Sequence, residues 1–105
     1  MTNVIKAYRM NEIINNAYAL SSHVAFNAHN ASSDEEIAIS LHELKLAIRA
    51  LELCKNFRDM IFENEDHIDG LSKIDIDKSI CSMDSMQKFT AWGLMKKIKM
   101  EDIRL

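Results

Sequence analysis

Apolar residues recur every three or four positions along three long stretches of the chain, the spacing that places them on one face of an α-helix. We therefore expect helices over about residues 4–30, 34–63 and 82–100. On the first of these, the apolar repeat and the small residues beside it favour close packing against another helix. The repeat consists of Met10, Ile13, Ala17, Leu20 and Val24.

The start of the second helix carries its own signal. Ser33 is followed three residues later by Glu36, and this pair forms the capping box that satisfies free backbone N–H groups at a helix N-terminus. Asp34, Glu35 and Glu36 also place negative charge at the positive end of the helix dipole. The pattern predicts that this helix begins near Asp34.

The second helix is apolar around most of its circumference. When residues 34–63 are sorted by position modulo seven, two positions form a narrow polar rail and the other five are largely apolar. The polar rail consists of His42, Lys45, Arg49, Glu52, Asn56, Asp59 and Glu63. The apolar arc is roughly twice the 100° of an ordinary surface helix. Because leaving one flank in water would forfeit on the order of 10 kcal/mol, we expect cover on at least two sides, including a second copy of the chain.

The connection between the second and third helices, residues 64–81, is rich in acidic residues. Gly70 is suited to a left-handed stop after the second helix. Residues 71–80 alternate apolar and polar with a period of two, which indicates an extended linker or a short helix. A calcium loop is excluded, because a loop that starts at Glu65 has Ile76 where the bidentate Glu belongs.

Turn-forming residues are scarce, with no proline and two glycines in 105 residues. Folds rich in β-sheet need such residues at short intervals. The fold class we predict is all-α: a single domain over residues 1–105, with two long antiparallel helices and a third packed across the pair. Dimerisation is expected to complete this helical bundle.

The sequence offers no constellation for catalysis or metal binding. His42 has Leu46 where a zincin helix needs a second His, and His23 and His29 are too far apart to share a helical face well. We predict no catalytic residue, no metal and no cofactor, and therefore no enzyme. The two cysteines suit reduced thiols, and the N-terminus lacks an apolar signal-peptide core. A cytoplasmic protein without a membrane span is expected.

The lysines near the C-terminus allow one alternative function. Lys96, Lys97 and Lys99 would contact phosphates in a nucleic-acid-associated transcriptional regulator. The competing interpretation is that they complement the dipole at the end of their own helix. Glu101 and Asp102 dilute the positive charge, so nucleic acid is the less favoured partner.

Two features point to a protein partner. The first is a methionine and aromatic cluster, because thioethers adapt to partners and Trp is frequent at binding hot spots. It consists of Met83, Met86, Phe89, Trp92 and Met95. The second is the uncharged polar side of the first helix, represented by Asn16, His23 and Asn27, since interface cores are depleted in Lys and Glu. The competing interpretations are an ordinary core and an ordinary solvated face.

The favoured function is therefore stoichiometric. We expect a small cytoplasmic protein that binds and masks a macromolecular partner, as an inhibitor, antitoxin-like regulator, chaperone or adaptor does. The abundance of Ile, Asn and Lys also suits an AT-rich gene of the kind that phages and plasmids carry. A small-ligand-binding helical bundle, with a pocket lined by Tyr8, Tyr18, Trp92 and the histidines, is the third hypothesis.

Overall fold

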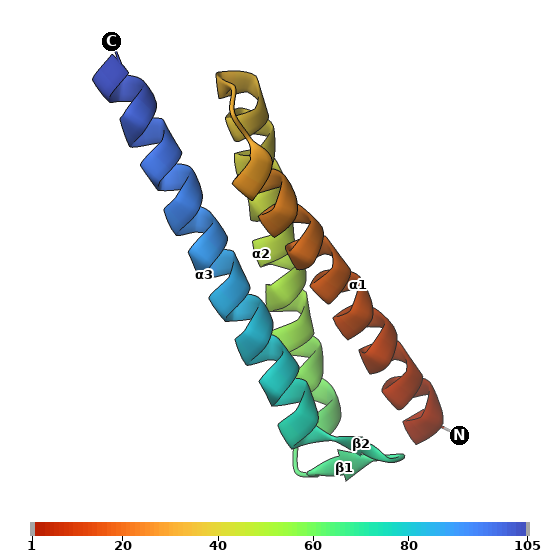
Figure 1. The fold of residues 1–105 in the computed structure, drawn as a ribbon. Helices are drawn as coiled ribbons and strands as arrows, with labels where there is room; N and C mark the ends of the chain where they lie inside the picture. Colours follow the sequence, from red (N-terminus) through yellow and green to blue (C-terminus); the bar gives the residue numbers. More distant parts are fainter. Residues whose placement is uncertain (1, 105) are drawn as a thin grey trace.

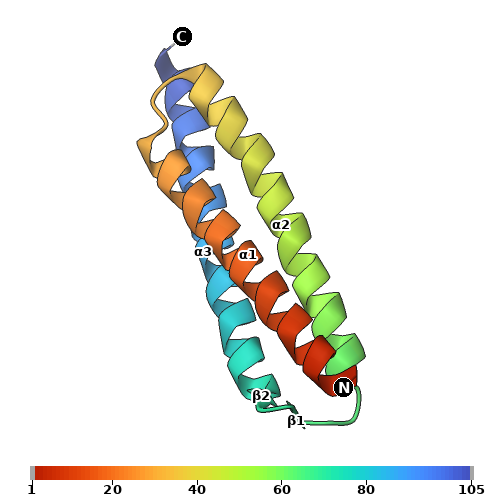
Figure 2. The ribbon, with the colours of Figure 1, turned by 90° about the vertical axis from the view of Figure 1, so that its right-hand side faces the viewer.

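Three long helices run up, down and up along one axis and form an elongated bundle (Figure 1). The computed structural model describes the backbone of residues 2–104 and the side chains of residues 3–98. The elements are α1 (Thr2–Asn30), α2 (Asp34–Phe62), β1 (His67–Ile68), β2 (Leu71–Ser72) and α3 (Lys73–Arg104). The predicted all-α helical bundle is confirmed. However, the third helix lies lengthwise beside the other two rather than across them, and the bundle measures 59 × 17 × 16 Å (Figure 2).

Buried side chains alternate at spacings of three and four along each helix and meet on the bundle axis. Along α1 they are Ala7, Met10, Ile14, Ala17, Ser21, Val24 and Ala28. Along α2 they are Ile37, Ser40, Leu44, Ala47, Leu51, Cys54, Ile61 and Phe62, and the half-buried Arg58 occupies the repeat position between Cys54 and Ile61. Along α3 they are Ile76, Ile80, Met83, Gln87, Thr90 and Leu94. This is the coiled-coil pattern, in which each helix buries two of every seven residues.

The core positions of α1 are shifted by one residue from part of the predicted stripe. Ile14 and Ser21 are buried, whereas Ile13 and Leu20 are half-buried at the flank. Ser21 carries a hydroxyl, and its burial depends on a hydrogen-bond partner from another helix. Periodicity alone cannot supply that information.

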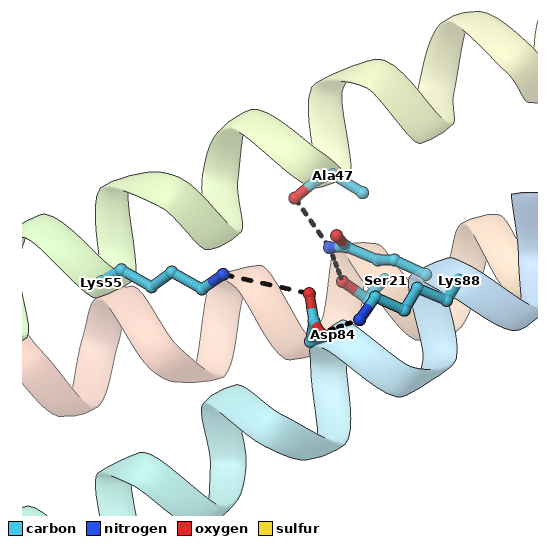
Figure 3. A network of polar contacts seen from close by, with 6 residues as sticks. Ser21, Ala47, Lys55, Asp84 and Lys88 are labelled. Atoms are coloured by element: carbon cyan, nitrogen blue, oxygen red, sulfur yellow. Dashed lines mark hydrogen bonds and ion pairs between the residues drawn. The ribbon is translucent and has the colours of Figure 1, made fainter.

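A polar layer divides the core into two apolar halves. The buried Gln87 amide nitrogen donates hydrogen bonds to the Ser21 hydroxyl and to the Ala47 carbonyl, each at 2.9 Å. Figure 3 shows Ser21 and Ala47 approaching this layer from two different helices. One apolar half includes Met10, Leu51 and Met83, and the other includes Val24, Leu44 and Leu94. Because a helix shifted along the axis would leave the Gln87 amide unpaired, the layer favours one register.

The junction between α1 and α2 matches the sequence analysis. The Ser33 hydroxyl accepts a hydrogen bond from the Glu36 backbone N–H and donates one to the Glu36 carboxylate, each at 3.1 Å. Helix α2 begins at Asp34. The predicted start of this helix and the N-cap bond of the predicted capping box are confirmed, and the Glu36 carboxylate accepts from the Ser33 hydroxyl rather than from the Ser33 backbone N–H.

The connection between α2 and α3 is shorter than predicted, because α3 begins at Lys73 rather than near residue 82. Strands β1 and β2 pair antiparallel around a turn in which Asp69 and Gly70 have φ values of +48° and +79°. Gly70 is thus left-handed as predicted, but it serves a hairpin rather than the end of α2. The hairpin places Ile68 in the core, where it covers the open end of the bundle.

The period-two pattern after Gly70 was misleading. Ile76 and Ile80 are buried at helical spacing and continue the α3 core, whereas Ile74 is exposed. An extended strand would place Ile74 and Ile76 on one face, but an α-helix separates residues two apart by about 200°. The tertiary core therefore selects the helix over residues 73–81.

Removing the capping hydroxyl tests the α1–α2 junction. The substitution Ser33→Ala is expected to lower the free energy of unfolding by about 1 kcal/mol, because the Glu36 N–H loses its acceptor. Urea unfolding followed by circular dichroism measures the change. The neighbouring Ser32→Ala is the control and should leave stability within about 0.5 kcal/mol of the wild type. Equal stability of the Ser33 variant and the wild type would contradict the assignment.

Candidate functional site

An open groove of about 600 Å³ runs between α1 and α3 near the end of the bundle where α1 terminates. We call it the α1–α3 groove. From α1 it is lined by Ala25, Ala28 and His29. From α3 it is lined by Ser85, Met86, Phe89, Thr90, Trp92, Gly93, Leu94 and Lys97. Most of these side chains are apolar or small, so the groove suits apolar side chains of a binding partner.

Small residues create the depth of this groove. Ala25 from α1 and Gly93 from α3 both line it, and neither projects a side chain long enough to fill it. A Cβ atom built on Gly93 would meet no atom within 4 Å, so helix packing does not require glycine there. Glycine inside a helix costs about 1 kcal/mol relative to alanine. Its presence therefore keeps space open at a cost in stability.

The α3 wall of the groove carries an exposed aromatic pair. Phe89 is 74% exposed and Trp92 is 55% exposed, with ring centroids 5.8 Å apart in an edge-to-face arrangement. The Lys96 ammonium lies 3.8 Å from the centre of the Trp92 ring, a cation–π contact. These contacts hold the two rings in place while leaving their outer faces accessible.

The predicted methionine and aromatic cluster does not form one surface. Met86 lines the groove, Met95 is exposed but does not line it, and Met83 is fully buried. Met83 occupies a core position of the α3 repeat and packs with the apolar half nearest the hairpin. Phe89, Trp92 and Met95 are therefore the exposed part of the cluster, and Met86 is half-buried in the groove.

Lys97 lines the groove and caps the C-terminal end of α1. Its ammonium donates hydrogen bonds to the carbonyls of Ala28 (2.8 Å), His29 (2.9 Å) and Ala31. These carbonyls lie at the C-terminal end of α1, where helix partners are missing and the dipole is negative. The predicted complement to a helix dipole is thus present, but the helix is α1 rather than α3.

This arrangement changes the interpretation of the C-terminal lysines. Lys97 is committed to backbone carbonyls, and Lys96 is stacked on Trp92. The side chain of Lys99 lies outside the described residues. A phosphate bound by Lys97 would have to displace these capping bonds.

The uncharged polar side of α1 faces a different neighbour. The Asn27 amide contacts His23 at 3.0 Å and donates to the Glu43 carboxylate of α2 at 3.4 Å. Asn16 and His23 are exposed. The structure therefore places the two predicted partner surfaces on separate sides of α1, one toward α2 and one toward α3.

Helix α2 carries a row of exposed apolar side chains, although α1 and α3 both pack against other faces of this helix. Ile39, Leu46, Leu53 and Met60 are between 45% and 62% exposed and lie seven residues apart. We call this row the α2 stripe. All seven residues of the polar rail are exposed as well. The predicted surplus of apolar surface on this helix is therefore real, and one chain does not cover it.

The pKa shifts at two side chains have structural causes. Burial raises the pKa of the Cys54 thiol, which donates a long hydrogen bond to the Ile13 carbonyl at 3.8 Å. A hydrogen bond from Lys88, 3.0 Å away, lowers the pKa of Asp84, and Lys55 lies 3.9 Å from the same carboxylate (Figure 3). Cys54 is thus held as a neutral core thiol, and Asp84 links α2 to α3.

Among the described residues, no three His, Cys, Asp or Glu side chains come together as a metal site. No helix in the same part of the chain is long and apolar enough to cross a bilayer. Comparison with protein families, curated proteins and solved structures gives no match. The surface geometry of the bundle is therefore the guide to its function.

Sequence reasoning found the aromatic wall of the groove but missed its α1 side. Ala25 and Ala28 look the same in sequence whether they pack against a helix or line an open groove. Gly93 was the one sign of the groove in the sequence, because a glycine is unusual inside such a strongly helical stretch. The α2 stripe could also have been identified from the sequence, since sorting residues 34–63 modulo seven places its four residues at one position.

The capping role of Lys97 predicts a stability effect. The substitution Lys97→Met keeps the aliphatic chain and removes the ammonium, so it is expected to lower the free energy of unfolding by about 1–3 kcal/mol. Lys96→Met is the control, with an expected loss of about 0.5 kcal/mol. Chemical denaturation measures both. A smaller loss at Lys97 than at Lys96 would show that the α1 carbonyls are satisfied by water instead.

The two glycines predict effects of opposite sign. Gly93→Ala is expected to raise the free energy of unfolding by about 0.5–1 kcal/mol, because alanine is the better helix former and the added methyl group meets open space. Gly70→Ala is expected to lower it by about 1 kcal/mol, because its φ of +79° is strained for alanine. Thermal and urea unfolding measure both variants. Destabilisation by Gly93→Ala would reveal a packing role for this glycine.

Proposed function

We propose that this chain is a non-enzymatic binding protein that captures and masks a protein partner through the α1–α3 groove. The observation that carries this proposal is the exposed Phe89–Trp92 pair beside a groove kept open by a helical glycine. A solvated helix surface rarely carries two neighbouring aromatic rings, and aromatic side chains dominate the energetics of protein interfaces.

The shape of the groove favours an amphipathic helix as the bound segment. The groove lies between two helices that run in the same direction, α1 and α3 (Figure 1). A third helix laid between them would place an apolar row on Met86, Phe89 and Gly93, as helix-in-groove recognition requires. Lys96 at the rim would favour acidic residues on the flank of that helix.

The energetics support the aromatic pair as the anchor. Removing a large apolar side chain from water contributes about 25 cal/mol per Å², and Phe89 and Trp92 expose more than half of their surfaces. Their edge-to-face contact orders them before binding, so less side-chain entropy is lost on association. Asn16, His23 and Asn27 offer mainly amide and imidazole groups that water already satisfies, which favours the groove over the α1–α2 side.

Self-association is part of the proposal. The α2 stripe leaves four large apolar side chains in water, and a second copy of the chain is the partner that is always present at the same concentration. A cytoplasmic homodimer that presents its grooves to a partner is consistent with an inhibitor, an antitoxin-like regulator, a chaperone or an adaptor.

A small apolar ligand is the second candidate occupant of the α1–α3 groove. The volume of about 600 Å³ lies within the range of small-molecule sites. The ligand site expected from the sequence would have joined Tyr8 to Trp92, but Tyr8 lines a separate concavity with Val4 and Ile5 near the start of α1. A ligand would therefore contact Trp92 and His29 without Tyr8.

Affinity capture from the organism that encodes the chain tests the proposal. Trp92→Glu is expected to abolish recovery of the partner while circular dichroism stays helical, because a charge replaces the exposed anchor. Ile74→Glu is the matched control, since Ile74 is 64% exposed on the same helix but lies near the hairpin, and it should retain the partner.

Three other results would count against the groove. Retention of the partner by both Trp92→Glu and Phe89→Glu would exclude the aromatic pair as the anchor. Loss of the partner in the double variant Asn16→Lys, Asn27→Lys, with Trp92 intact, would move the site to the α1–α2 side. A small molecule that co-purifies with the wild type and raises its melting temperature, but not that of Trp92→Glu, would favour the ligand hypothesis.

A further inference from the structure

The segments of α1 and α3 that line the α1–α3 groove contain no acidic residue. All 16 Asp and Glu residues of the chain lie outside residues 13–33 and 85–98, although the chain as a whole has a net charge of −3. The same two segments carry three lysines, Lys88, Lys96 and Lys97. The groove therefore lies where the acidic chain is locally basic, and this charge is complementary to an acidic partner.

Two of the three lysines are already engaged within the chain. Lys88 pairs with Asp84 at 3.0 Å. Lys97 donates hydrogen bonds to three carbonyls at the end of α1. Lys96 lies at the rim of the groove, with its ammonium 3.8 Å from the centre of the Trp92 ring, and no acidic side chain among the described residues pairs with it. Of the three lysines, Lys96 is thus the one that can bind a carboxylate from another molecule.

The neighbouring helices favour one direction for a helix bound in the groove. Helices α1 and α3 run in the same direction, and the groove lies near the end where α1 terminates (Figure 1). Because adjacent helices of an up-and-down bundle are antiparallel, a helix between α1 and α3 would begin at this end. Its first turn would then lie at the level of Lys96 and Lys97, where Lys97 caps α1. Carboxylates are favoured in a first turn by the helix dipole, and Lys96 adds to this preference.

We propose that the segment bound in the α1–α3 groove is an acidic amphipathic helix, antiparallel to α1 and α3, with carboxylates of its first turn on Lys96. This inference rests on the proposed function and specifies the chemistry of its partner. The α3 wall of the groove extends from Ser85 to Lys97, about 18 Å of helix, which accommodates about three turns. A large apolar side chain of the bound helix would occupy the open space beside Gly93.

A nucleic acid or an anionic lipid surface fits the groove less well than a helix does. Both kinds of partner present many negative charges and are bound by several cations together, whereas Lys96 alone among the three groove lysines is uncommitted. The lining is mostly apolar and includes Met86, Phe89 and Trp92. Apolar side chains spaced three and four apart on a helix match such a lining.

Selection from a displayed peptide library tests the proposal with the full chain as bait. The library presents helical peptides with a fixed leucine row at spacings of three and four and random residues elsewhere. Gly93→Leu is the groove-filled reference, because its side chain would occupy the groove while favouring the helix. Peptides enriched on the wild type but not on Gly93→Leu should carry Asp or Glu in their first turn more often than the unselected library.

Charge reversal at Lys96 tests the assigned contact. The same selection on Lys96→Glu should enrich Lys or Arg in the first turn, and acidic peptides from the wild-type selection should bind this variant several-fold more weakly at low salt. Lys88→Glu is the matched control, because it makes the same charge change on the same helix. Lys88 pairs with Asp84, which lies 3.9 Å from Lys55 of α2, so this variant should keep the wild-type preference.

The possible failures are distinguishable. Acidic residues enriched in the last turn would overturn the antiparallel direction. Groove-dependent peptides that have no acidic preference, or that keep it on Lys96→Glu, would overturn the acidic chemistry and leave the groove proposal standing. Enriched peptides that bind Gly93→Leu as well as the wild type, or no enrichment on the wild type, would overturn the groove proposal too. Binding of phosphatidylserine vesicles or a thymidine oligonucleotide that is lost in Gly93→Leu, without any enriched peptide, would overturn a helix as the occupant.

Discussion

A narrow core shared by three helices is the constraint on which the rest of this structure depends. In coiled-coil packing each helix turns two of every seven residues toward the axis, and the flanking positions are covered only in part. Helix α2 is apolar at many more positions than that. Its surplus cannot enter the core, whatever the arrangement of the other two helices, and it emerges as the row from Ile39 to Met60. The exposed apolar surface is thus a consequence of the bundle geometry.

Hydrogen bonds from two polar side chains, Gln87 and Lys97, hold the three helices in one register. Gln87 ties α3 to Ser21 of α1 and to the backbone of α2 at the middle of the bundle. Lys97 ties α3 to the carbonyls that end α1. Both contacts cross between helices that apolar residues alone would allow to slide. They also place α1 and α3 so that Ala25 and Gly93 line the same groove, and the candidate site therefore depends on the same contacts as the register.

The two exposed apolar surfaces have different characters, and this difference supports different roles. The α2 stripe is a straight, evenly spaced row of exposed apolar side chains along one helix. The α1–α3 groove is concave, carries an ordered aromatic pair and contains a glycine that packing does not require. Such a site suits a partner with its own shape. Because the surfaces involve different helix pairs, self-association and partner binding are compatible.

The sequence by itself determined the helical class, the start of α2 at the Ser33 capping box, the exposure of the polar rail and the excess of apolar surface on α2. These properties depend on neighbours three or four residues apart, so periodicity and local hydrogen bonding reveal them. Only the tertiary structure decided that Ser21 is core, that residues 73–81 are helix, that Met83 is buried while Phe89 is exposed, and that Lys97 caps α1 instead of its own helix. The Ser21 and Lys97 contacts join residues far apart in the chain, and one sequence contains no periodic signal for such contacts. Residues 71–83 carry two competing periods, and the tertiary core selects the helical one by burying Ile76, Ile80 and Met83.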